Sequence, residues 1–532
     1  MRERSEHVAP TGTAAQLAAL RADLVRAGYT TDHLAELLGP VASAALHRDQ
    51  HLPVLRALEG SPDPVAAVVR LLVLGCAEPA SALDTALPRT GARGLLELGL
   101  TVLVQDAASG GDETDGGDET DGRDGGNGGD ETVGAVLRAT CDLRPYGDER
   151  HDWWLASDLS ETVLGHALPT DHVLGIGGAS TTLASWTPRP RVARALDLGT
   201  GCGVQALHLT GHVDRIVATD LSSRALDYAR FNAGLNDVEL DLRQGSLLEP
   251  VQGEEFDLVV SNPPFVITPR RQGVPLFEYR DGGAAGDALV AGLVRDVATV
   301  LAPGGIAQLL GNWELTPGEE WTDRVGGWLD GTGLDAWVIQ RETQDTAEYA
   351  ETWARDGGHR PGTALFDDLY AAWLDDFAER GVDRVGFGII TLQRPATDRE
   401  PFRVLEEVAT PVAQPSGLAV LAGLAARTWV AEHTDDELLA VPWSVADDVT
   451  EERVGRPGAP DPMVIQLRQG GGLRRVARLD SVTAGLVGAS DGDLTARQIL
   501  SGIAVLTDQR VAVLTAEVLP LLRELVADGF LR

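Results

Sequence analysis

The spacing of hydrophobic residues changes several times along the chain and predicts several separate segments. Between residue 14 and about residue 105, leucines and valines recur every three or four positions, as in Leu17, Leu20 and Leu24, which is the spacing of amphipathic helices. We therefore expect a mostly helical domain at 1–105. Within it, residues 80–103 predict two helices and a strand, the order of a winged helix, although a helical cap that packs on the rest of the protein explains them more simply.

Residues 170–395 alternate between short apolar segments and amphipathic helical ones. The expected strands lie at 194–198, 215–219, 238–243, 256–261, 305–310, 334–341 and 385–393. The expected helices lie at 203–211, 222–234 and 286–301. This alternation predicts an α/β fold with a seven-stranded, doubly wound, Rossmann-like sheet whose two faces are covered by helices. A long insertion at 344–384 separates the last two strands.

The segments on either side of this region have different patterns. Residues 106–132 repeat Asp-Glu-Thr three times, contain ten acidic residues and one arginine, and offer no apolar cluster to bury, so we expect an acidic disordered loop. Residues 133–169 predict a small strand-rich connector, with strands at 134–143 and 152–158. Residues 398–532 predict a C-terminal α+β domain that ends in a helical or winged-helix-like module.

Length limits the number of domains, and charge limits the classes of partner that the protein can bind. A chain of 532 residues is too long for one hydrophobic core, and about three domains are expected. The formal net charge of −36 opposes nonspecific binding to nucleic acid, because such binding needs a basic surface. All 44 basic residues are arginine, so the chain has no lysine that could act as a general base or form a Schiff base.

The sequence also predicts the cellular compartment and whether the protein binds a metal ion. No segment reaches about 18 consecutive apolar residues, and the first residues lack the apolar core of a signal peptide, so we expect a cytoplasmic protein without a membrane span. Cys76, Cys141 and Cys202 lie far apart and form no CxxC pair, which suits a reducing compartment. The histidines show no metal-ligand spacing, and we expect no metal ion.

A glycine-rich sequence, Asp197-Leu-Gly-Thr-Gly-Cys-Gly203, follows an expected strand and opens an expected helix. Its glycines permit a tight turn and the close approach of a ligand to the backbone, and the helix aims its N-terminus at that ligand. We expect a nucleotide-type cofactor site that uses Asp197, Gly199, Thr200, Gly201 and Gly203. The glycine spacing alone leaves an NAD-binding domain open, although dinucleotide enzymes usually carry GxGxxG.

Two further strand ends complete the expected cofactor site. Asp220 ends the next strand, 23 residues after Asp197, and its two carboxylate oxygens suit the two hydroxyls of a ribose. Leu221 would then pack on an adenine ring. Ser246, after the following strand, would accept a hydrogen bond from the adenine amino group.

The fourth expected strand ends in Asn262-Pro263-Pro264-Phe265. The two prolines fix the backbone and remove N–H donors, so that carbonyl groups face the pocket. The side-chain oxygen of Asn262 and the carbonyl of Pro263 can each accept a hydrogen bond from one NH2 group, while Phe265 stacks on the plane that carries it. Such positioning turns the nitrogen lone pair toward an electrophile without a strong base, and it favours methyl transfer over NAD chemistry.

Together these motifs resemble the class I S-adenosylmethionine-dependent methyltransferases with an NPP(Y/F) motif, which include the HemK-type glutamine-N5 methyltransferases of release factors and the adenine-N6 and guanine-N2 methyltransferases. The segment Tyr279-Arg-Asp-Gly-Gly283 is most similar to the release-factor type. The resemblance covers about 170–395 and does not extend to the flanking domains. It implies S-adenosyl-L-methionine as cofactor, with Asp197 at the methionine end and Asn262 beside both cofactor and acceptor. Such enzymes often carry an acid where Ser246 stands, and the serine hydroxyl can also accept a hydrogen bond.

Other residues near the motif suggest how ligands are held. Arg270 and Arg271 would meet a phosphate or an acidic substrate peptide, and a solvated pair is the alternative. Upstream, Thr181 or Thr182 would contact the carboxylate of the cofactor, and a turn that caps a helix at Ser180 is the alternative.

The insertion at 344–384 is rich in aromatic residues. They are Tyr349, Trp353, Phe366, Tyr370, Trp373 and Phe377. Three of them share one helical face, which favours core packing, and a lid over the substrate is the alternative.

Taken together, the residues predict a methyltransferase that acts on a planar NH2 group. The leading acceptor is the side-chain amide of glutamine in a protein substrate, such as a translation factor, because the chain is acidic and carries Gly282 and Gly283. The exocyclic amine of adenine or guanine in RNA or DNA is the first alternative. A noncatalytic scaffold that binds the cofactor is an alternative of another class.

Overall fold

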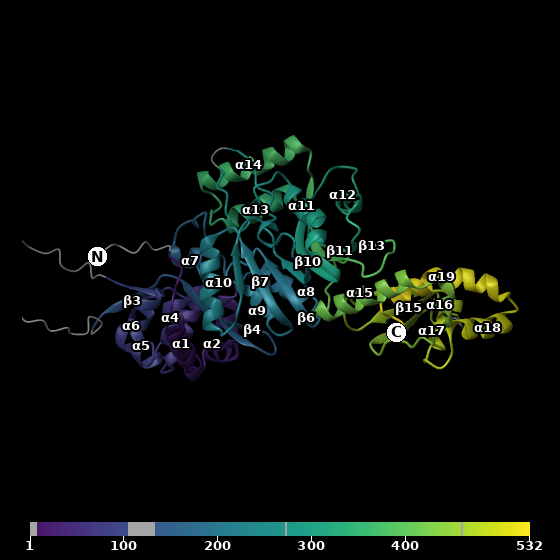
Figure 1. The fold of residues 1–532 in the computed structure, drawn as a ribbon, viewed down its shortest axis with the longest axis horizontal. Coiled ribbons are helices and arrows are strands. Elements are labelled where there is room, and N and C mark those ends of the chain that lie inside the picture. The colour runs from purple at the N-terminus through teal and green to yellow at the C-terminus, as the bar shows by residue number, and fades with distance from the viewer. Residues whose placement is uncertain (1–7, 105–133, 272–273, 459–460) are drawn as a thin grey trace, which may run out of the picture.

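The computed structural model describes residues 8–104, 134–271, 274–458 and 461–532. The molecule is elongated, with the N-terminal helices at one end, the large sheet in the middle and the C-terminal helices at the other end (Figure 1). The acidic segment expected at 106–132 lies outside the described residues. Among the helices that are described, none combines the length and the apolar character needed to cross a membrane.

Helices dominate the N-terminal part, as the leucine spacing predicts. They are α1 (Ala14–Ala27), α2 (Thr31–Leu46), α3 (His51–Leu58), α4 (Pro64–Leu72), α5 (Ala80–Ala86) and α6 (Gly91–Leu98). The first helix follows a capping box, in which the Thr13 hydroxyl accepts a hydrogen bond from the Gln16 amide. The short strands β1 (Glu78–Pro79), β2 (Thr101–Leu103) and β3 (Val136–Ala139) form an antiparallel sheet in the order β1-β3-β2.

The strand expected at 134–143 is two strands in the structure, because the chain bends at Thr140 and Cys141. The first is β3, and the second, β4 (Asp142–Gly147), pairs with β5 (Asp152–Ser157), which precedes the short helix α7 (Glu161–Leu164). The Asn232 amide, on α10 (Ser223–Leu235), accepts a hydrogen bond from the Ala156 N–H at 2.7 Å and donates to the Ala156 carbonyl at 2.9 Å. This hairpin is therefore fixed to the central part of the molecule.

The central sheet has eight strands in the order β13-β11-β12-β10-β9-β6-β7-β8. Their bounds are β6 (Val192–Leu198), β7 (Val213–Asp220), β8 (Asp241–Gln244), β9 (Phe256–Ser261), β10 (Leu301–Leu315), β11 (Asp335–Asp345), β12 (Arg384–Gln393) and β13 (Arg403–Glu407). Strands β10, β9, β6, β7 and β8 are parallel, and β12 is antiparallel to both of its neighbours. All seven expected strands are present, and the predicted α/β class is confirmed.

The eighth strand, β13, was not predicted. It pairs in parallel with β11 at the edge of the sheet, and only Val404 and Leu405 within it are apolar. A short edge strand with charged residues at its ends has too few buried positions to give an alternating pattern. The sheet consequently extends to residue 407, beyond residue 395, where the predicted domain ends.

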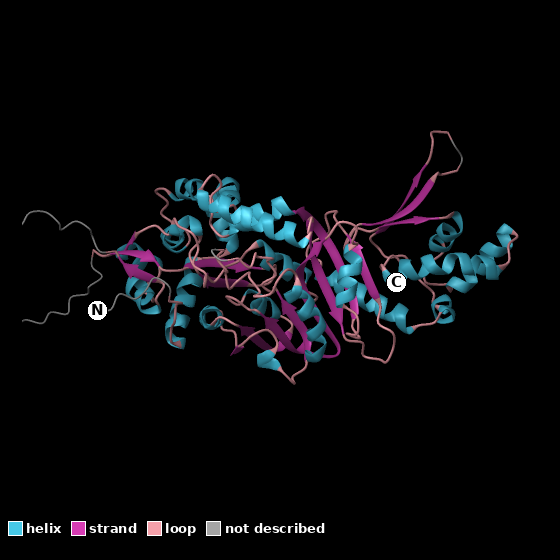
Figure 2. Ribbon diagram, turned by 90° about the horizontal axis from the view of Figure 1, so that it is seen from above, coloured by secondary structure: helices cyan, strands magenta, loops and turns pink. Residues whose placement is uncertain are grey.

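Helices pack against both faces of the sheet, and the strands cross the middle of the molecule (Figure 2). The helices of this region, besides α10, are α8 (Gly178–Trp186), α9 (Val204–Leu209), α11 (Ala288–Asp296), α12 (Trp321–Trp328), α13 (Thr346–Asp356) and α14 (Ala364–Arg380). Neighbouring residues of β6 point to opposite cores: Ala195 packs with Leu209 of α9, and Leu196 with Leu293 of α11. A strand that is buried on both faces requires this arrangement.

The insertion at 344–384 contributes aromatic residues to a separate core. Tyr349, Trp373 and Phe377 are fully buried, and they pack with Val266 and Ile267, which directly follow the Asn-Pro-Pro-Phe motif. The structure therefore places these rings in a core that supports the motif, in line with the simpler of the two interpretations.

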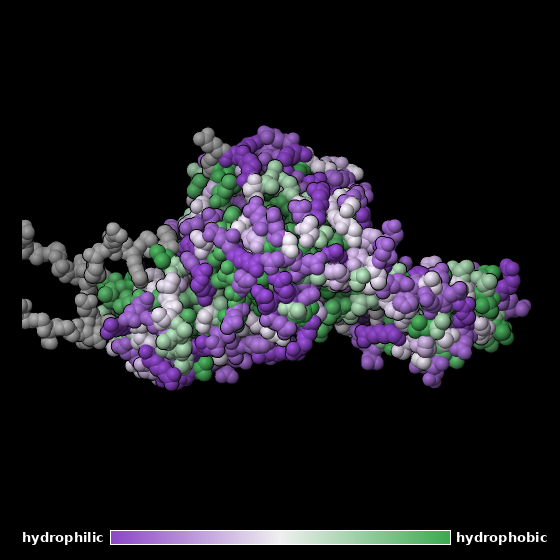
Figure 3. All heavy atoms as spheres, viewed as in Figure 1, coloured by the Kyte–Doolittle hydropathy of each residue, from purple (hydrophilic) through white to green (hydrophobic). Residues whose placement is uncertain are grey.

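The C-terminal part has its own core, built around Trp443 and Phe530. Its elements are α15 (Gly417–Glu432), α16 (Asp435–Ala440), β14 (Val449–Val454), β15 (Val464–Gln469), β16 (Val476–Leu479), α17 (Ser481–Gly488), α18 (Ala496–Thr507) and α19 (Val511–Ala527). The three strands form an antiparallel sheet in the order β14-β15-β16. At the far end of α18, Val505 and Leu506 are largely exposed and contribute to a hydrophobic area at the tip of the molecule (Figure 3).

Candidate active site

The glycine-rich turn after β6 depends on backbone conformations that favour glycine. Gly199, Gly201 and Gly203 have φ angles of +73°, +55° and +94°, in the region that residues with a Cβ rarely adopt. The amides of Gly199 and Thr200 both donate to the carbonyl of Thr219 on β7, each at 2.9 Å. The turn is therefore fixed to the neighbouring strand, and α9 begins directly after Gly203.

Asp197 lies behind this turn and supports it. Its carboxylate is buried, and Oδ2 accepts hydrogen bonds from the Thr200 hydroxyl at 2.6 Å and from the Ala206 amide at 2.9 Å. Burial raises the pKa of Asp197 to about 7. Oδ1 has no hydrogen-bond partner among the described residues, and Asp197 is not part of the lining of the adjacent cavity. Its contact with the methionine end of a cofactor stays a prediction, and Oδ1 is the atom free to make it.

Asp220, at the end of β7, faces the same turn from the other side. Its Oδ2 accepts a hydrogen bond from the Gly201 amide at 2.8 Å, and its Oδ1 accepts one from the Ser222 amide at 2.9 Å. A carboxylate offers about four acceptor positions, so both oxygens can still accept a hydrogen bond from a ligand. Burial raises the pKa of Asp220.

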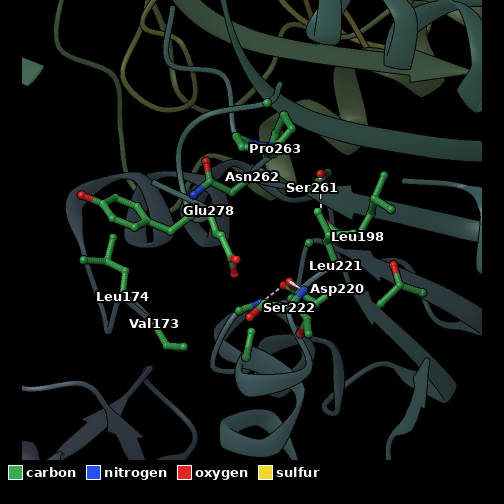
Figure 4. A pocket seen from close by; sticks show the side chains of 18 of the residues that line it. Val173, Leu174, Leu198, Asp220, Leu221, Ser222, Ser261, Asn262, Pro263 and Glu278 are labelled. Carbon is green, nitrogen blue, oxygen red and sulfur yellow. Dashed lines mark hydrogen bonds between the residues drawn. The ribbon is translucent and has the colours of Figure 1, made fainter. Parts of the chain in front are cut away.

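These strand ends open into a cavity of about 360 Å³ (Figure 4). The glycine turn, Asp220, Leu221 and Ser246 form one wall, and the segment 276–283 forms another. In α/β folds, ligands bind outside the carboxyl ends of parallel strands, and this volume lies in the range of small-molecule and cofactor sites. Leu221 is 65% exposed although it is large and apolar, so it is available to pack against a flat ring.

Asn262 lines this cavity, directly after β9 (Figure 4). Its Oδ1 is buried and has no hydrogen-bond partner among the described residues. Pro263 and Pro264 also line the cavity. The preceding hydroxyl, on Ser261, donates to the carbonyl of Leu198 at 2.8 Å, and this bond joins the end of β9 to the end of β6. The acceptor motif and the cofactor turn are thus held side by side.

Phe265 lies next to the cavity and is not part of its lining. Its ring meets Trp353 of α13 edge to face, with 6.2 Å between ring centroids. The backbone beyond it is held by two buried aromatic side chains: the Tyr349 hydroxyl accepts a hydrogen bond from the Ile267 amide, and the Trp373 indole donates to the Ile267 carbonyl, each at 2.8 Å. The stacking of Phe265 on an acceptor group stays a prediction.

Arg270 and Arg271 lie outside the cavity and have partners within the protein. The Arg270 guanidinium donates to the carbonyl of Ala284 at 2.8 Å. Arg271 forms ion pairs with Asp375 at 3.1 Å and with Glu379 at 2.7 Å, both on α14. The contacts of Arg271 join the segment after the motif to the insertion. The role of the two arginines in substrate binding stays a prediction.

The upstream glycine-rich segment contributes to the cavity through other residues than the threonines considered above. His172, Leu174, Gly175 and Ser180 line the cavity, whereas the Thr181 hydroxyl donates to the carbonyls of Gly177 and Gly178 at its own helix start. Thr182 is likewise outside the lining. The described residues contain no group of three or more His, Cys, Asp or Glu side chains that could hold a metal ion.

Several polar side chains that line the cavity were not predicted as site residues, among them those of Glu278 and Tyr279. Glu278 and Tyr279 lie in the segment between the motif and Gly282, and both line the cavity. Tyr279 donates from its hydroxyl to Asp356 of α13 at 2.8 Å. Both residues directly precede the Arg-Asp-Gly-Gly segment, and this position is the feature of the sequence that could have indicated them. The contact of Tyr279 with the insertion depends on long-range packing, which the spacing of residues along the sequence does not reveal.

Family comparisons agree with this geometry. Residues 175–316 match a family described as the methyltransferase small domain. With the sheet order and the paired motifs, the match identifies the central part of the chain as a class I S-adenosylmethionine-dependent methyltransferase domain. Two matches flank it, both to families described as domains of unknown function: DUF7059 at 26–110 and DUF7782 at 422–532.

Individual relatives match part of the chain. Over 165 residues the chain is 36% identical to a release factor glutamine methyltransferase of Deinococcus radiodurans, which covers 28% of this chain and 58% of that protein. Over 140 residues it is 37% identical to a ribosomal protein uL3 glutamine methyltransferase of Bordetella pertussis, covering 24% of this chain and 46% of that protein. The chain thus spans about half the length of these relatives. Among solved structures, a methyltransferase from Pyrococcus furiosus has 16% identity over 44% of this chain and 92% of that chain, with a TM-score of 0.26, too low to bear on function.

Proposed function

We propose that this protein is an S-adenosylmethionine-dependent methyltransferase, and that its acceptor is the planar NH2 group of a glutamine side chain in a protein. The observation that carries the proposal is the unpartnered, buried Oδ1 of Asn262, in the cavity that Asp220 and the glycine turn also line. A buried acceptor without a partner costs about 1–3 kcal/mol. An NH2 group that enters the cavity would satisfy it.

The residues around the turn suit the proposed cofactor. S-adenosylmethionine, when bound, supplies an electrophilic methyl group on a positively charged sulfur. The carboxylate of Asp220 has acceptor capacity left for the two ribose hydroxyls, and exposed Leu221 offers an apolar surface to the adenine. Gly199 and Gly201 line the cavity and leave no side chain between the backbone and the ligand, whereas Gly203 is not part of the lining.

The residues after β9 suit the proposed acceptor. Asn262 Oδ1 and the carbonyl of Pro263 would accept the two hydrogens of the NH2 group and so direct its lone pair toward the methyl group. The nitrogen then forms a bond to carbon and releases one proton, and no strong base is required at the site. The buried rings of Tyr349 and Trp373 keep the motif backbone in place through Ile267.

Several observations support a protein acceptor over a nucleic acid. Two relatives are named as glutamine methyltransferases of a release factor and of ribosomal protein uL3. The net charge of −36 opposes binding to a polyanion. Arg271, which would have been a phosphate contact, is already paired with Asp375 and Glu379.

The experiment that tests this proposal measures transfer of a labelled methyl group from S-adenosylmethionine into the lysate of a strain that lacks the protein. The full chain and its Asn262→Ala variant are compared, and the labelled product is divided between protease and nuclease treatment. We expect label that is lost with protease and that depends on Asn262. Label that is lost with nuclease would point instead to an exocyclic amine of RNA or DNA. Cofactor binding without any transfer would favour the noncatalytic scaffold.

A further inference from the structure

Glu278 lies in the wall of the cavity, on the segment that follows the Asn-Pro-Pro-Phe motif. Its side chain points into the cavity and lies between Asn262 and Asp220 in the close-up view (Figure 4). Within the described part of the chain, no hydrogen bond or ion pair holds its carboxylate. A carboxylate in a ligand cavity with no cation beside it indicates that the ligand itself carries the complementary charge.

The position of Glu278 is set by the backbone on both sides of it. The Glu278 amide donates to the carbonyl of Thr170 at 2.9 Å. The next two side chains both bind Asp356 of α13: the Tyr279 hydroxyl at 2.8 Å and the buried Arg280 guanidinium at 2.7 Å. Glu278 is thereby presented to the cavity by a fixed segment, although its own carboxylate contacts no partner.

Asp220 supplies a second carboxylate to the same cavity from a different element, β7. Burial is the main cause that raises the pKa of Asp220, and the negative charge of Glu278 also raises it. Both carboxylates line the same cavity, so their negative charges act on the same ligand. Neither forms an ion pair with another described residue, so the cavity carries a negative potential that favours a cation.

We propose that Glu278 makes the cavity selective for the positive charge of its cofactor, and this inference rests on the function proposed above. In methyl transfer the carbon–sulfur bond breaks with its electron pair left on sulfur, a nitrogen–carbon bond forms, and the nitrogen loses a proton. The sulfur is therefore cationic before transfer and neutral afterwards. The Glu278 charge strengthens binding of S-adenosylmethionine relative to S-adenosylhomocysteine, and so favours exchange of product for fresh cofactor.

A different role for Glu278 would change the affinities for the two compounds in a different way. A contact with the ribose or with the amino group would strengthen the binding of both compounds equally, because both contain these groups. A charge effect on the sulfur acts on one compound alone. With an effective dielectric constant of about 20, one unit charge about 12 Å away changes an affinity by about tenfold, and a closer charge changes it by more.

The test is isothermal titration of the full chain with three ligands: S-adenosylmethionine, S-adenosylhomocysteine and sinefungin, in which a protonated amine replaces the methylated sulfur. Wild type is compared with Glu278→Gln, which removes the charge and nearly keeps the shape. The control variant is Glu239→Gln, which removes one charge from an exposed residue outside the cavity.

We expect Glu278→Gln to weaken the binding of S-adenosylmethionine and sinefungin by at least about tenfold and that of S-adenosylhomocysteine by less than about twofold, with the difference reduced at high salt. Glu239→Gln should leave all three affinities unchanged. Equal weakening of all three ligands, or no change in any of them, would overturn the charge-selection proposal while leaving the methyltransferase proposal intact. Wild-type protein that binds none of the three ligands would overturn both.

Discussion

The Gly201 amide donates a hydrogen bond to Oδ2 of Asp220, with 2.8 Å between the two atoms. This bond joins the turn after β6 to the end of β7. Gly201 has a φ of +55°, a conformation that a residue with a Cβ adopts only with strain. The glycine spacing and the acid 19 residues later therefore act as one unit: the carboxylate expected to bind the ribose also holds the turn that approaches the cofactor.

We predict that Gly203→Ala lowers the free energy of unfolding by about 1–2 kcal/mol, because Gly203 has a φ of +94° and its conformation is unfavourable for alanine. The added Cβ would lie 3.6 Å from the Cα of Ala229, an ordinary contact, so backbone strain and not a clash is the cause. Denaturant titration of the full chain measures the effect. The control is Gly178→Ala in α8, where a Cβ meets nothing within 4 Å and φ is not positive; this variant should be no less stable than wild type.

The buried carboxyl of Asp197 predicts that the stability of the protein depends on pH. Burial raises its pKa from 3.8 to about 7, so the folded state binds this proton more tightly than the unfolded chain does. The corresponding stability is fully present below about pH 4 and is lost as the pH rises toward about 7. Asp197→Asn removes this titration, so the stability of the variant relative to wild type should rise by about 2–3 kcal/mol between about pH 5 and about pH 8. A difference that stays constant over this range would contradict the buried, raised-pKa carboxyl.

The hydroxyl of Tyr349 supports the motif and offers a clean test. It accepts hydrogen bonds from the Ile267 amide at 2.8 Å and from the Asn312 side chain at 2.9 Å. Tyr349→Phe leaves both buried donors without an acceptor, so we predict a loss of about 1–3 kcal/mol in stability and a lower kcat with little change in cofactor affinity. The matched control is Tyr370→Phe, a half-buried tyrosine on the same insertion. Equal effects of the two substitutions would show that the hydroxyl of Tyr349 does not support the site.

The ion pairs of Arg271 predict a structural role for this residue. Because its guanidinium is paired with Asp375 and Glu379, Arg271→Gln should raise the KM for the acceptor by less than about twofold. Glu379→Gln should have no larger effect, and the double variant should be no worse than Arg271→Gln alone, since that substitution already removes the ion pair with Glu379. A tenfold rise in KM that is confined to Arg271→Gln would instead support direct binding of the substrate.

The sequence predicts the centre of this molecule better than its edges, for physical reasons. The predicted strand 256–261 has the bounds of β9, because its residues are mostly apolar, with Leu258, Val259 and Val260 in succession, and Asn262-Pro263 follows it directly. By contrast, β13 has two apolar residues and gives no periodic signal, and it is recognised only through its pairing with β11.

The same division applies to the candidate site. Local conformation requires the glycines at 199, 201 and 203, so the turn is visible in the sequence. The positions of Glu278 and Tyr279 depend on Asp356 of α13, and the pairing of Arg271 depends on α14. Contacts between residues 77 or more positions apart leave no trace in the local pattern.

The central claim is that Asn262 positions the acceptor for methyl transfer. The measurement that tests it most directly is a paired one on Asn262→Ala and wild type: equilibrium affinity for S-adenosylmethionine and rate of methyl transfer into the protease-sensitive acceptor. We predict that the variant keeps its cofactor affinity within about threefold and loses transfer by at least about a hundredfold, as expected when an oriented hydrogen-bond acceptor is removed. Transfer at the wild-type rate by a variant that still binds the cofactor would contradict this account.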